Sequence, residues 1–211
     1  MQTNTLIRTY LKEHLEIARG LEGQVDEIEK LFNAILNTYE KNGDLFCFGN
    51  GGGASTAEHF ASDIGIHPFV SDDKKTPMSI KRLRVHCLNQ SVDLITRIAN
   101  DIGFVDLFSE QLKRYELNKN DTVIAFSISG HSSNIIRALL RAREFGATTV
   151  LIGGRTGGEA KAYSDICILV PGTSQFPGQV GPNDNCFNIE DFQVSISHMM
   201  AGLLKEAVCK N

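Results

Sequence analysis

The sequence predicts an α/β fold in which a parallel sheet is covered by helices on both faces. From residue 44 onward, short and nearly continuous apolar runs follow turn residues, and each run precedes a segment with helical periodicity. Strands that are apolar along their whole length are typical of parallel sheets buried on both faces. The chain has 211 residues, 42% of them hydrophobic, and no Pro- or Ser-rich linker divides it, so we expect a single domain.

The N-terminal segment, residues 1–42, is predicted to be helical, and residues 43–211 to form the α/β core of the same domain. Apolar side chains recur at helical spacing from Thr5 to Glu40, which indicates one long helix or two helices joined near Gly20 and Gly23. A helix with so broad an apolar stripe either covers a sheet or packs on a partner chain. The spacing favours neither alternative.

Five strands alternate with helical segments in the predicted core. The strands are expected at residues 45–50, 83–89, 122–129, 148–154 and 165–170. The helical segments are expected at Ser55–Ile64, Ser91–Tyr115 with a break near Gly103, Ser132–Phe145, Gly158–Tyr163 and Ile189–Val208. Ligands of such sheets bind at the carboxyl ends of the strands, so the residues that follow each strand are the candidates for a site.

Composition and charge exclude several classes of partner. The net charge is −4 and the basic residues are scattered, which argues against nucleic acid and anionic membranes. The N-terminus lacks the apolar block of a secretory signal, and no apolar run approaches membrane-spanning length. The five cysteines are widely spaced without a CxxC pair, which disfavours a disulfide framework and a zinc ribbon. We therefore expect a cytoplasmic protein.

The turn after the first predicted strand, Gly49-Asn50-Gly51-Gly52-Gly53-Ala54, satisfies the dinucleotide-binding pattern GxGxxG/A. Other features disfavour a nucleotide site. The acids about twenty residues further on, Asp72 and Asp73, lie in a Lys-rich loop rather than at a strand end, and no GK[ST] follows. The glycines are better interpreted as a backbone opened for close approach of a polar group.

The turn after the third predicted strand carries four serines within seven residues, Ser127, Ser129, Ser132 and Ser133. Hydroxyls and free N–H groups at the start of a helix favour an anion such as a phosphate monoester. The alternative is that Ser132 or Ser133 only caps the helix. Since one cap needs one serine, the sequence favours anion binding.

Two predicted helices carry a histidine together with acids. His59 and Asp63 lie four residues apart on one helix face, whereas Glu190 and Asp191 stand two turns before His198 on the last helix. On an ideal helix Asp191 is offset from His198 by about 20° and Glu190 by about 80°, so the angle favours Asp191 as its partner. Polar residues on surface helices are the simpler interpretation. A divalent metal site or an acid–base pair is the alternative.

Several stretches occur together in one order: GNGG around Asn50 with AEHFASD ending at Asp63, ANDIGFVDLF at 99–108, SISGHSSNIIRAL from Ser127, LIGGRTGG from Leu151, DICILVP, and NIEDFQVSISH ending at His198. In this combination the chain resembles the sugar isomerase (SIS) domain family and, within it, the phosphoheptose isomerases. The resemblance implies a single SIS domain with a five-stranded, flavodoxin-like parallel sheet, assembled as a homotetramer with active sites between subunits. It also implies conversion of sedoheptulose 7-phosphate to D-glycero-D-manno-heptose 7-phosphate by a metal-assisted enediol mechanism.

The resemblance further implies roles for individual residues. Asp63 maps to the catalytic base and His198 to the catalytic histidine. Residues that face the substrate map to Asn50, Gly51, Gly52, Gly53, Ser91, Ser127, Ile128, Ser129, Ser132 and Glu190, with the serines holding the phosphate. The ligands of one Zn²⁺ or other divalent ion per subunit map to His59, Asp63, Glu190 and His198. The family register thus selects Glu190, where the helix angle favours Asp191.

The chain departs from the family pattern at several of these positions. Asp63 stands where the family usually has Glu, Glu190 where it has Gln, Gly53 where it has Ser, Ile128 where it has Thr, and Ser91 where it has Asp. Isomerisation of another sugar phosphate is therefore one alternative. A non-catalytic member that binds a replication initiator is a second, against which the retention of Asp63 and His198 argues. A phosphosugar-sensing regulator would need room for a DNA-binding domain, which is not expected here.

Overall fold

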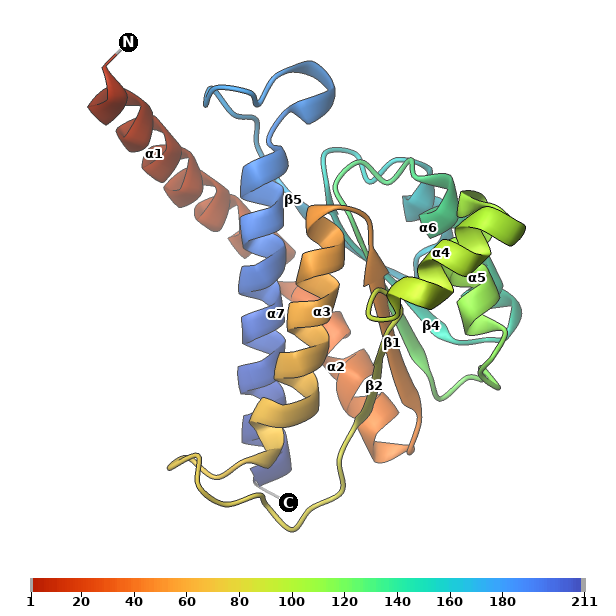
Figure 1. Ribbon diagram of the computed structural model, residues 1–211. Helices are drawn as coiled ribbons and strands as arrows, with labels where there is room; N and C mark the ends of the chain where they lie inside the picture. Colours follow the sequence, from red (N-terminus) through yellow and green to blue (C-terminus); the bar gives the residue numbers. More distant parts are fainter. Residues whose placement is uncertain (1, 210–211) are drawn as a thin grey trace.

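Five parallel strands form the sheet at the centre of the molecule (Figure 1). The computed structural model describes residues 2–209. Its strands are β1 (Asp44–Gly49), β2 (Arg84–Cys87), β3 (Thr122–Ser127), β4 (Thr148–Gly154) and β5 (Ile166–Val170). They are arranged in the order β2-β1-β3-β4-β5, with every neighbouring pair parallel. This is the flavodoxin-like strand order, so the predicted fold class is confirmed.

The helices fall close to the predicted segments. They are α1 (Thr3–Leu21), α2 (Val25–Glu40), α3 (Gly52–Ile66), α4 (Val92–Asp101), α5 (Leu107–Leu112), α6 (Ser133–Glu144) and α7 (Cys186–Cys209). Short 3₁₀ turns lie at Glu22–Gln24, His67–Phe69, Phe104–Asp106, Glu159–Tyr163 and Gly181–Asn183. The first turn divides the N-terminal segment into two helices, and Gly103 separates α4 from α5 as predicted. The segment that ends at Tyr163 is a 3₁₀ turn rather than an α-helix.

Different helices cover the two faces of the sheet. On one face α2, α3 and α7 bury a core that includes Phe60 and Met200, and α3 and α7 lie side by side (Figure 1). On the other face α4, α5 and α6 bury Phe108 and Leu139. Because successive strand residues point to opposite faces, each buried strand contributes to both layers. The carboxyl ends of the strands are left as the edge where loops can form a site.

Helix α1 projects from the body of the molecule (Figure 1). Its C-terminal part buries Ile17 and Leu21 next to the start of α7. By contrast, Ile7, Leu11 and Leu15 are 55%, 59% and 59% exposed. In the N-terminal segment α2 therefore covers the sheet, as one of the two alternatives predicts, whereas α1 keeps an uncovered apolar stripe in the single chain. Packing of this stripe on a partner chain stays a prediction. No helix within residues 2–209 is both long and apolar enough to cross a membrane.

Asp44 ties the edge strand β2 to β1. Arg84 donates from Nε to Oδ1 at 2.8 Å and from Nη2 to Oδ2 at 2.7 Å, and His86 Nε2 lies 2.7 Å from Oδ1. Burial raises the pKa of Asp44, but the hydrogen bonds and charges of Arg84 and His86 outweigh it and hold this pKa below its usual value. A carboxyl group whose pKa is lowered by folding stabilises the fold above its unfolded pKa, and that contribution is lost as pH falls through the folded pKa.

We expect Asp44→Asn to lower the free energy of unfolding at neutral pH by about 1 kcal/mol, because two side chains lose a charged acceptor. The difference between variant and unaltered protein should narrow as the pH falls below about 4, the ordinary pKa of an aspartate in the unfolded chain, and it should vanish once the pH lies below the lowered folded pKa. Urea unfolding over this range measures it. Glu29→Gln on the exposed face of α2 is the control. A difference that stays constant with pH would contradict the assignment.

Candidate functional site

The turns after β1 and β3 meet at the carboxyl edge of the sheet. β1 lies between β2 and β3, so the chain leaves β1 and β3 in opposite directions, and ligands of α/β sheets bind at such a switch point. The amides of Asn50 and Asn134 join the two turns through two reciprocal hydrogen bonds of 2.9 Å. The glycine turn and the serine turn predicted from the sequence are therefore neighbours in space.

A cavity of about 210 Å³ lies between these turns. It is lined by Asn50, Phe126, Ser127, Ile128, Ser129, Ser132, Arg155, Pro182 and Cys186. We call it the serine pocket. It brings together five of the residues predicted to face the substrate, namely Asn50, Ser127, Ile128, Ser129 and Ser132.

The serine hydroxyls remain able to donate into the serine pocket. Ser127 Oγ accepts from Gly130 N at 3.2 Å, and Ser129 Oγ accepts from His131 N at 3.3 Å, so both keep their own proton free. Ser132 occupies the N-cap position of α6, yet its side chain makes no capping hydrogen bond. The alternative in which Ser132 only caps the helix is thus not observed. Hydroxyl donors at a helix N-terminus favour an anion.

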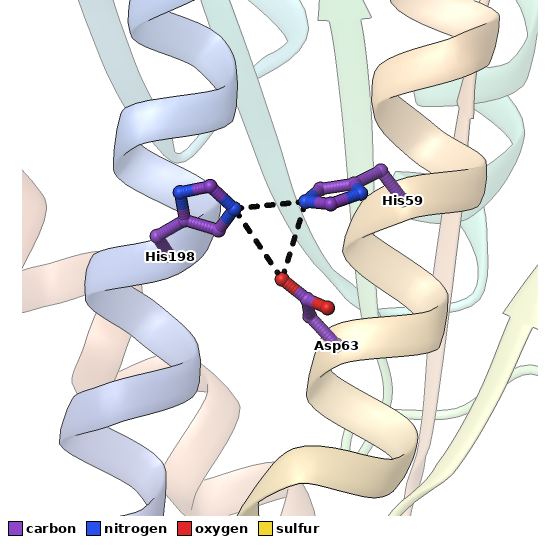
Figure 2. Close-up of side chains that lie close together, drawn as sticks. All are labelled: His59, Asp63 and His198. Atoms are coloured by element: carbon purple, nitrogen blue, oxygen red, sulfur yellow. Dashed lines mark hydrogen bonds and ion pairs between the residues drawn. The ribbon is translucent and has the colours of Figure 1, made fainter.

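A second polar cluster lies between α3 and α7 (Figure 2). His59 Nε2 lies 2.8 Å from His198 Nε2, and Asp63 Oδ2 lies 3.3 Å from the first nitrogen and 3.5 Å from the second. The side chains of His59, Asp63 and His198 are 46%, 30% and 57% exposed. We call these three residues the histidine cluster. Two residues one turn apart on α3 are completed by one residue of α7.

The donor atoms of the histidine cluster fit a divalent metal ion. Two imidazole nitrogens and one carboxylate oxygen are the kind of three-ligand set that catalytic zinc sites use, with a fourth position left open. A tetrahedral ion with bonds of about 2.0–2.1 Å separates its ligand atoms by about 3.3 Å. The observed separations of 2.8, 3.3 and 3.5 Å bracket that value. Among residues 2–209, the histidine cluster is the group of three or more His, Cys, Asp or Glu side chains whose potential ligand atoms all lie within 4.8 Å of one another.

The two acids at the start of α7 lie elsewhere. A Cβ placed on Gly52 would lie 2.1 Å from Glu190 Oε1, so the carboxylate of Glu190 lies against the glycine turn. Burial, and then the charge of Asp191, raise the pKa of Glu190. Asp191 Oδ2 accepts a hydrogen bond from the Tyr10 hydroxyl and lies 3.5 Å from His14 Nε2. Both acids thus have their neighbours at the N-terminal end of α7, Glu190 at the glycine turn and Asp191 at α1.

The helix-angle argument that paired Asp191 with His198 is therefore wrong. Seven residues advance about 10.5 Å along a helix axis, so two side chains on the same face at that spacing do not meet. The same reasoning separates Glu190 from His198 by about 12 Å. Glu190 does not join the histidine cluster within this chain, and its role as a metal ligand stays a prediction.

Two further residues predicted to face the substrate, Ser91 and Gly53, do not line the serine pocket. Ser91 precedes α4 and donates to Asp93 Oδ1 at 2.6 Å, and it does not line the cavity. Gly53 is buried, and a Cβ there would lie 2.8 Å from Phe126 O. The serine that the family usually has at position 53 would thus require a backbone shift in this chain.

Arg155 is a pocket residue that the sequence reasoning missed. It directly follows β4 and lines the serine pocket, with a backbone φ of +56°. Its position in the sequence could have identified it, because Arg155 is a charged residue at the carboxyl end of a predicted strand, where ligands of such sheets bind. It stands between two pairs of glycines in LIGGRTGG. The contacts of α1 with α7 were also missed, because nothing in the local pattern links Tyr10 and His14 to Asp191.

The chain is similar to known proteins along nearly its whole length. Residues 9–154 match the family model described as the SIS domain. The phosphoheptose isomerase of Helicobacter pylori (strain ATCC 700392 / 26695) is 27% identical over 205 residues, covering 97% of this chain and 96% of the relative. The phosphoheptose isomerase of Aneurinibacillus thermoaerophilus is 30% identical over 209 residues, which cover 96% of this chain and 96% of the relative. The structure of phosphoheptose isomerase GmhA from Neisseria gonorrhoeae matches with a TM-score of 0.81 and 22% identity, over 97% of this chain and 100% of that one.

We expect the purified protein to bind a divalent ion at the histidine cluster. His59→Ala and His198→Ala each remove one of three ligand atoms, so Zn²⁺ affinity should fall by more than about 100-fold, beyond the loss typical of outer-sphere partners. Titration against a competing chelator measures it. His131→Ala, which changes an exposed histidine of the serine turn, is the control. Unchanged affinity in both cluster variants would remove the cluster as a metal site.

Proposed function

This chain belongs to the SIS domain family, and from that premise we propose that it converts sedoheptulose 7-phosphate to D-glycero-D-manno-heptose 7-phosphate. The relatives that align along nearly its whole length are phosphoheptose isomerases. The enzyme class is thus an aldose–ketose isomerase of sugar phosphates. The observation that carries the proposal is the histidine cluster, because two imidazoles and a carboxylate that converge on one point suit proton transfer or metal binding.

The serine pocket is proposed to hold the phosphate of the substrate. Its hydroxyls, together with the N-terminus of α6, provide donors for phosphate oxygens. Binding the end of the sugar that does not react fixes the orientation of the end that does. This contribution does not depend on the identity of the sugar, so it supports the class of substrate rather than one compound.

The separation of the two polar regions supports a long sugar. His59 lies seven residues beyond Gly52, which is about 10 Å along α3. An extended seven-carbon chain, with six bonds of about 1.5 Å in a zigzag, spans about 7.5 Å, and the phosphate ester at its end adds about 2–3 Å. A substrate phosphate near the glycine turn thus leaves the opposite end of a heptose within reach of the histidine cluster.

Asp63 is proposed as the catalytic base. Isomerisation of a ketose requires a proton to move between adjacent carbons through an enediol, while a second proton moves between their oxygens. Asp63 Oδ2 faces the two imidazoles, whereas Oδ1 makes no hydrogen bond within residues 2–209 and points away from them (Figure 2). Oδ1 is therefore the atom that we assign to proton abstraction at carbon.

His198 is proposed to carry the proton between the two substrate oxygens, because one imidazole nitrogen can donate a proton while the other accepts one. When bound by His59, Asp63 and His198, a Zn²⁺ or other divalent ion would polarise the substrate carbonyl. His198 Nε2 cannot be a metal ligand and a proton carrier at the same moment. The metal content of active protein therefore decides which of the two roles His198 fills.

The assembly proposed for the protein is a homotetramer with active sites between subunits. Two observations support it: the uncovered stripe of Ile7, Leu11 and Leu15 on α1, and the exposure of His59 and His198 in the single chain. Apolar stripes of this kind mark surfaces that other chains cover. A neighbouring subunit over the cluster would also exclude water from the reacting atoms.

A panel of five-, six- and seven-carbon sugar phosphates, assayed together with metal analysis, tests the activity. We expect turnover of the seven-carbon ketose phosphate and its loss by more than about 100-fold in both Asp63→Asn and His198→Ala, since each removes a proton-transfer group. Circular dichroism of both variants controls for folding. If the protein is metal-free and turns over none of these sugars, the enzyme assignment fails and the binding-protein alternative takes its place.

The uncovered stripe of α1 gives a separate prediction on assembly. Leu11→Glu combined with Leu15→Glu places two charges in the proposed interface, so the molar mass in light scattering should fall from that of a tetramer. Val92→Glu on α4 changes another exposed apolar residue and should leave the mass unchanged. Equal masses for all three proteins would exclude α1 from the interface.

A further inference from the structure

Arg155 is the one cationic side chain among the residues that line the serine pocket. It is half-buried and its backbone is left-handed, with a φ of +56°. A left-handed backbone is unfavourable for a residue with a side chain and persists only where its surroundings hold it. Contacts of Arg155 with its surroundings must therefore hold this conformation at the edge of the serine pocket.

The guanidinium is held by the segment that leads into α7. Nη2 donates to Pro182 O at 2.6 Å and to Asp184 O at 2.9 Å, Nε donates to Asp184 O at 3.2 Å, and Nη2 also lies 3.3 Å from Cys186 Sγ. Nη1 makes no hydrogen bond within residues 2–209. One edge of the guanidinium is thus fixed by the backbone, while the other terminal nitrogen stays free.

None of these partners carries a negative charge that neutralises Arg155. The acceptors are backbone carbonyls and a thiol, and burial raises the pKa of the Cys186 thiol, so it stays neutral. None of the ion pairs found among residues 2–209 includes Arg155. A half-buried cation without a counter-ion is unfavourable, and an anion in the adjoining cavity relieves it.

We propose that Arg155 contacts the phosphate of the substrate in the serine pocket and supplies the positive charge that the serine hydroxyls lack. This rests on the proposed function, which names a sugar phosphate as the substrate. Guanidinium groups donate to phosphate oxygens through hydrogen bonds that are stronger than those of neutral donors. The carbonyls of Pro182 and Asp184 hold the group before the ligand arrives, so less freedom is lost on binding.

This assignment gives the two kinds of donor different tasks. The serine hydroxyls are neutral and can bind phosphate or a neutral sugar hydroxyl alike. Arg155 discriminates in favour of the charged group, since its attraction depends on the charge of the ligand. Loss of Arg155 should therefore raise KM for a sugar phosphate and leave kcat nearly unchanged, because the reacting atoms lie at the histidine cluster.

The direct test is calorimetric titration of the purified full chain with inorganic phosphate. Arg155→Gln should weaken phosphate binding by at least about tenfold, the range expected for a lost hydrogen bond to a charged group. Arg143→Gln is the matched control, because Arg143 Nη1 also donates to a backbone carbonyl, Ala162 O at 3.0 Å, but lies at the opposite end of α6 from the serine pocket. Its phosphate affinity should stay unchanged.

A second variant separates loss of charge from loosening of the segment. Gln179 is buried and its Oε1 accepts from Phe187 N at 2.7 Å, so Gln179→Ala loosens the same segment and keeps the arginine. Phosphate affinity should fall less in Gln179→Ala than in Arg155→Gln, because the charge is kept and only the support of the segment is weakened, and the affinity of Arg155→Lys should lie between those of Arg155→Gln and the unaltered protein. A loss in Gln179→Ala equal to that in Arg155→Gln would overturn the proposal. So would unchanged affinity in folded Arg155→Gln.

The isomerase assay distinguishes this inference from the proposed function. If the protein isomerises no sugar phosphate but its phosphate binding depends on Arg155, the proposed function fails and Arg155 remains the phosphate contact. If it isomerises the heptose phosphate and Arg155→Gln changes neither KM nor phosphate affinity, the inference about Arg155 fails alone. Ser129→Ala should also raise KM and serves as a positive comparison within the same pocket.

Discussion

The close approach of α3 to the end of the sheet is the constraint on which both halves of the site depend. A Cβ on Gly53 would lie 2.8 Å from Phe126 O, so a side chain at position 53 would require the start of α3 to shift relative to β3. The helix then buries Ala57 and Phe60 against the sheet. With that face fixed, His59 and Asp63 leave α3 on the side where α7 lies (Figure 2). The geometry of the histidine cluster thus follows from packing at the glycine turn.

Helix α7 is fixed by an equally specific contact. Gln193 is fully buried, and its Nε2 donates to Ile152 O of β4 at 2.7 Å. Ile196 and Met200 bury on the same side, so His198 is turned toward α3. Arg155 of the serine pocket directly follows β4. The same strand therefore contacts both the serine pocket and α7, the helix that contributes His198 to the histidine cluster. Shifts of α7 are therefore expected to affect both regions.

The fold was predictable because it depends on short-range patterns. Short apolar runs bounded by turn residues, such as residues 122–129, favour buried strands, and their alternation with helical segments favours a parallel sheet. The position of the serine turn was predictable for a similar reason, since a turn between an apolar run and a helical segment can be recognised from the neighbouring sequence. His59 and Asp63 could be paired from their spacing on one helix. These features need only the neighbouring sequence.

Contacts between distant helices were not predictable in this way. The angular argument for Asp191 neglected the rise along α7, and only the packed structure shows that this acid meets Tyr10 and His14 instead. That His198 faces Asp63 depends on the register between α3 and α7, which no local pattern contains. Here the family resemblance supplied what periodicity could not. Neither the periodicity nor the family resemblance identified Arg155, because a single arginine among glycines has no periodicity.

The aspartate at position 63 is consistent with the spacing of the helices. The family usually has Glu there, whose carboxylate reaches one methylene further. In this chain Asp63 Oδ2 already lies 3.3 Å from His59 Nε2 and 3.5 Å from His198 Nε2, so a longer side chain would have to fold back to keep both distances. The short side chain also leaves Oδ1 directed away from the imidazoles (Figure 2). With aspartate at position 63, one carboxylate oxygen faces the two imidazoles and the other stays available for the proposed proton transfer.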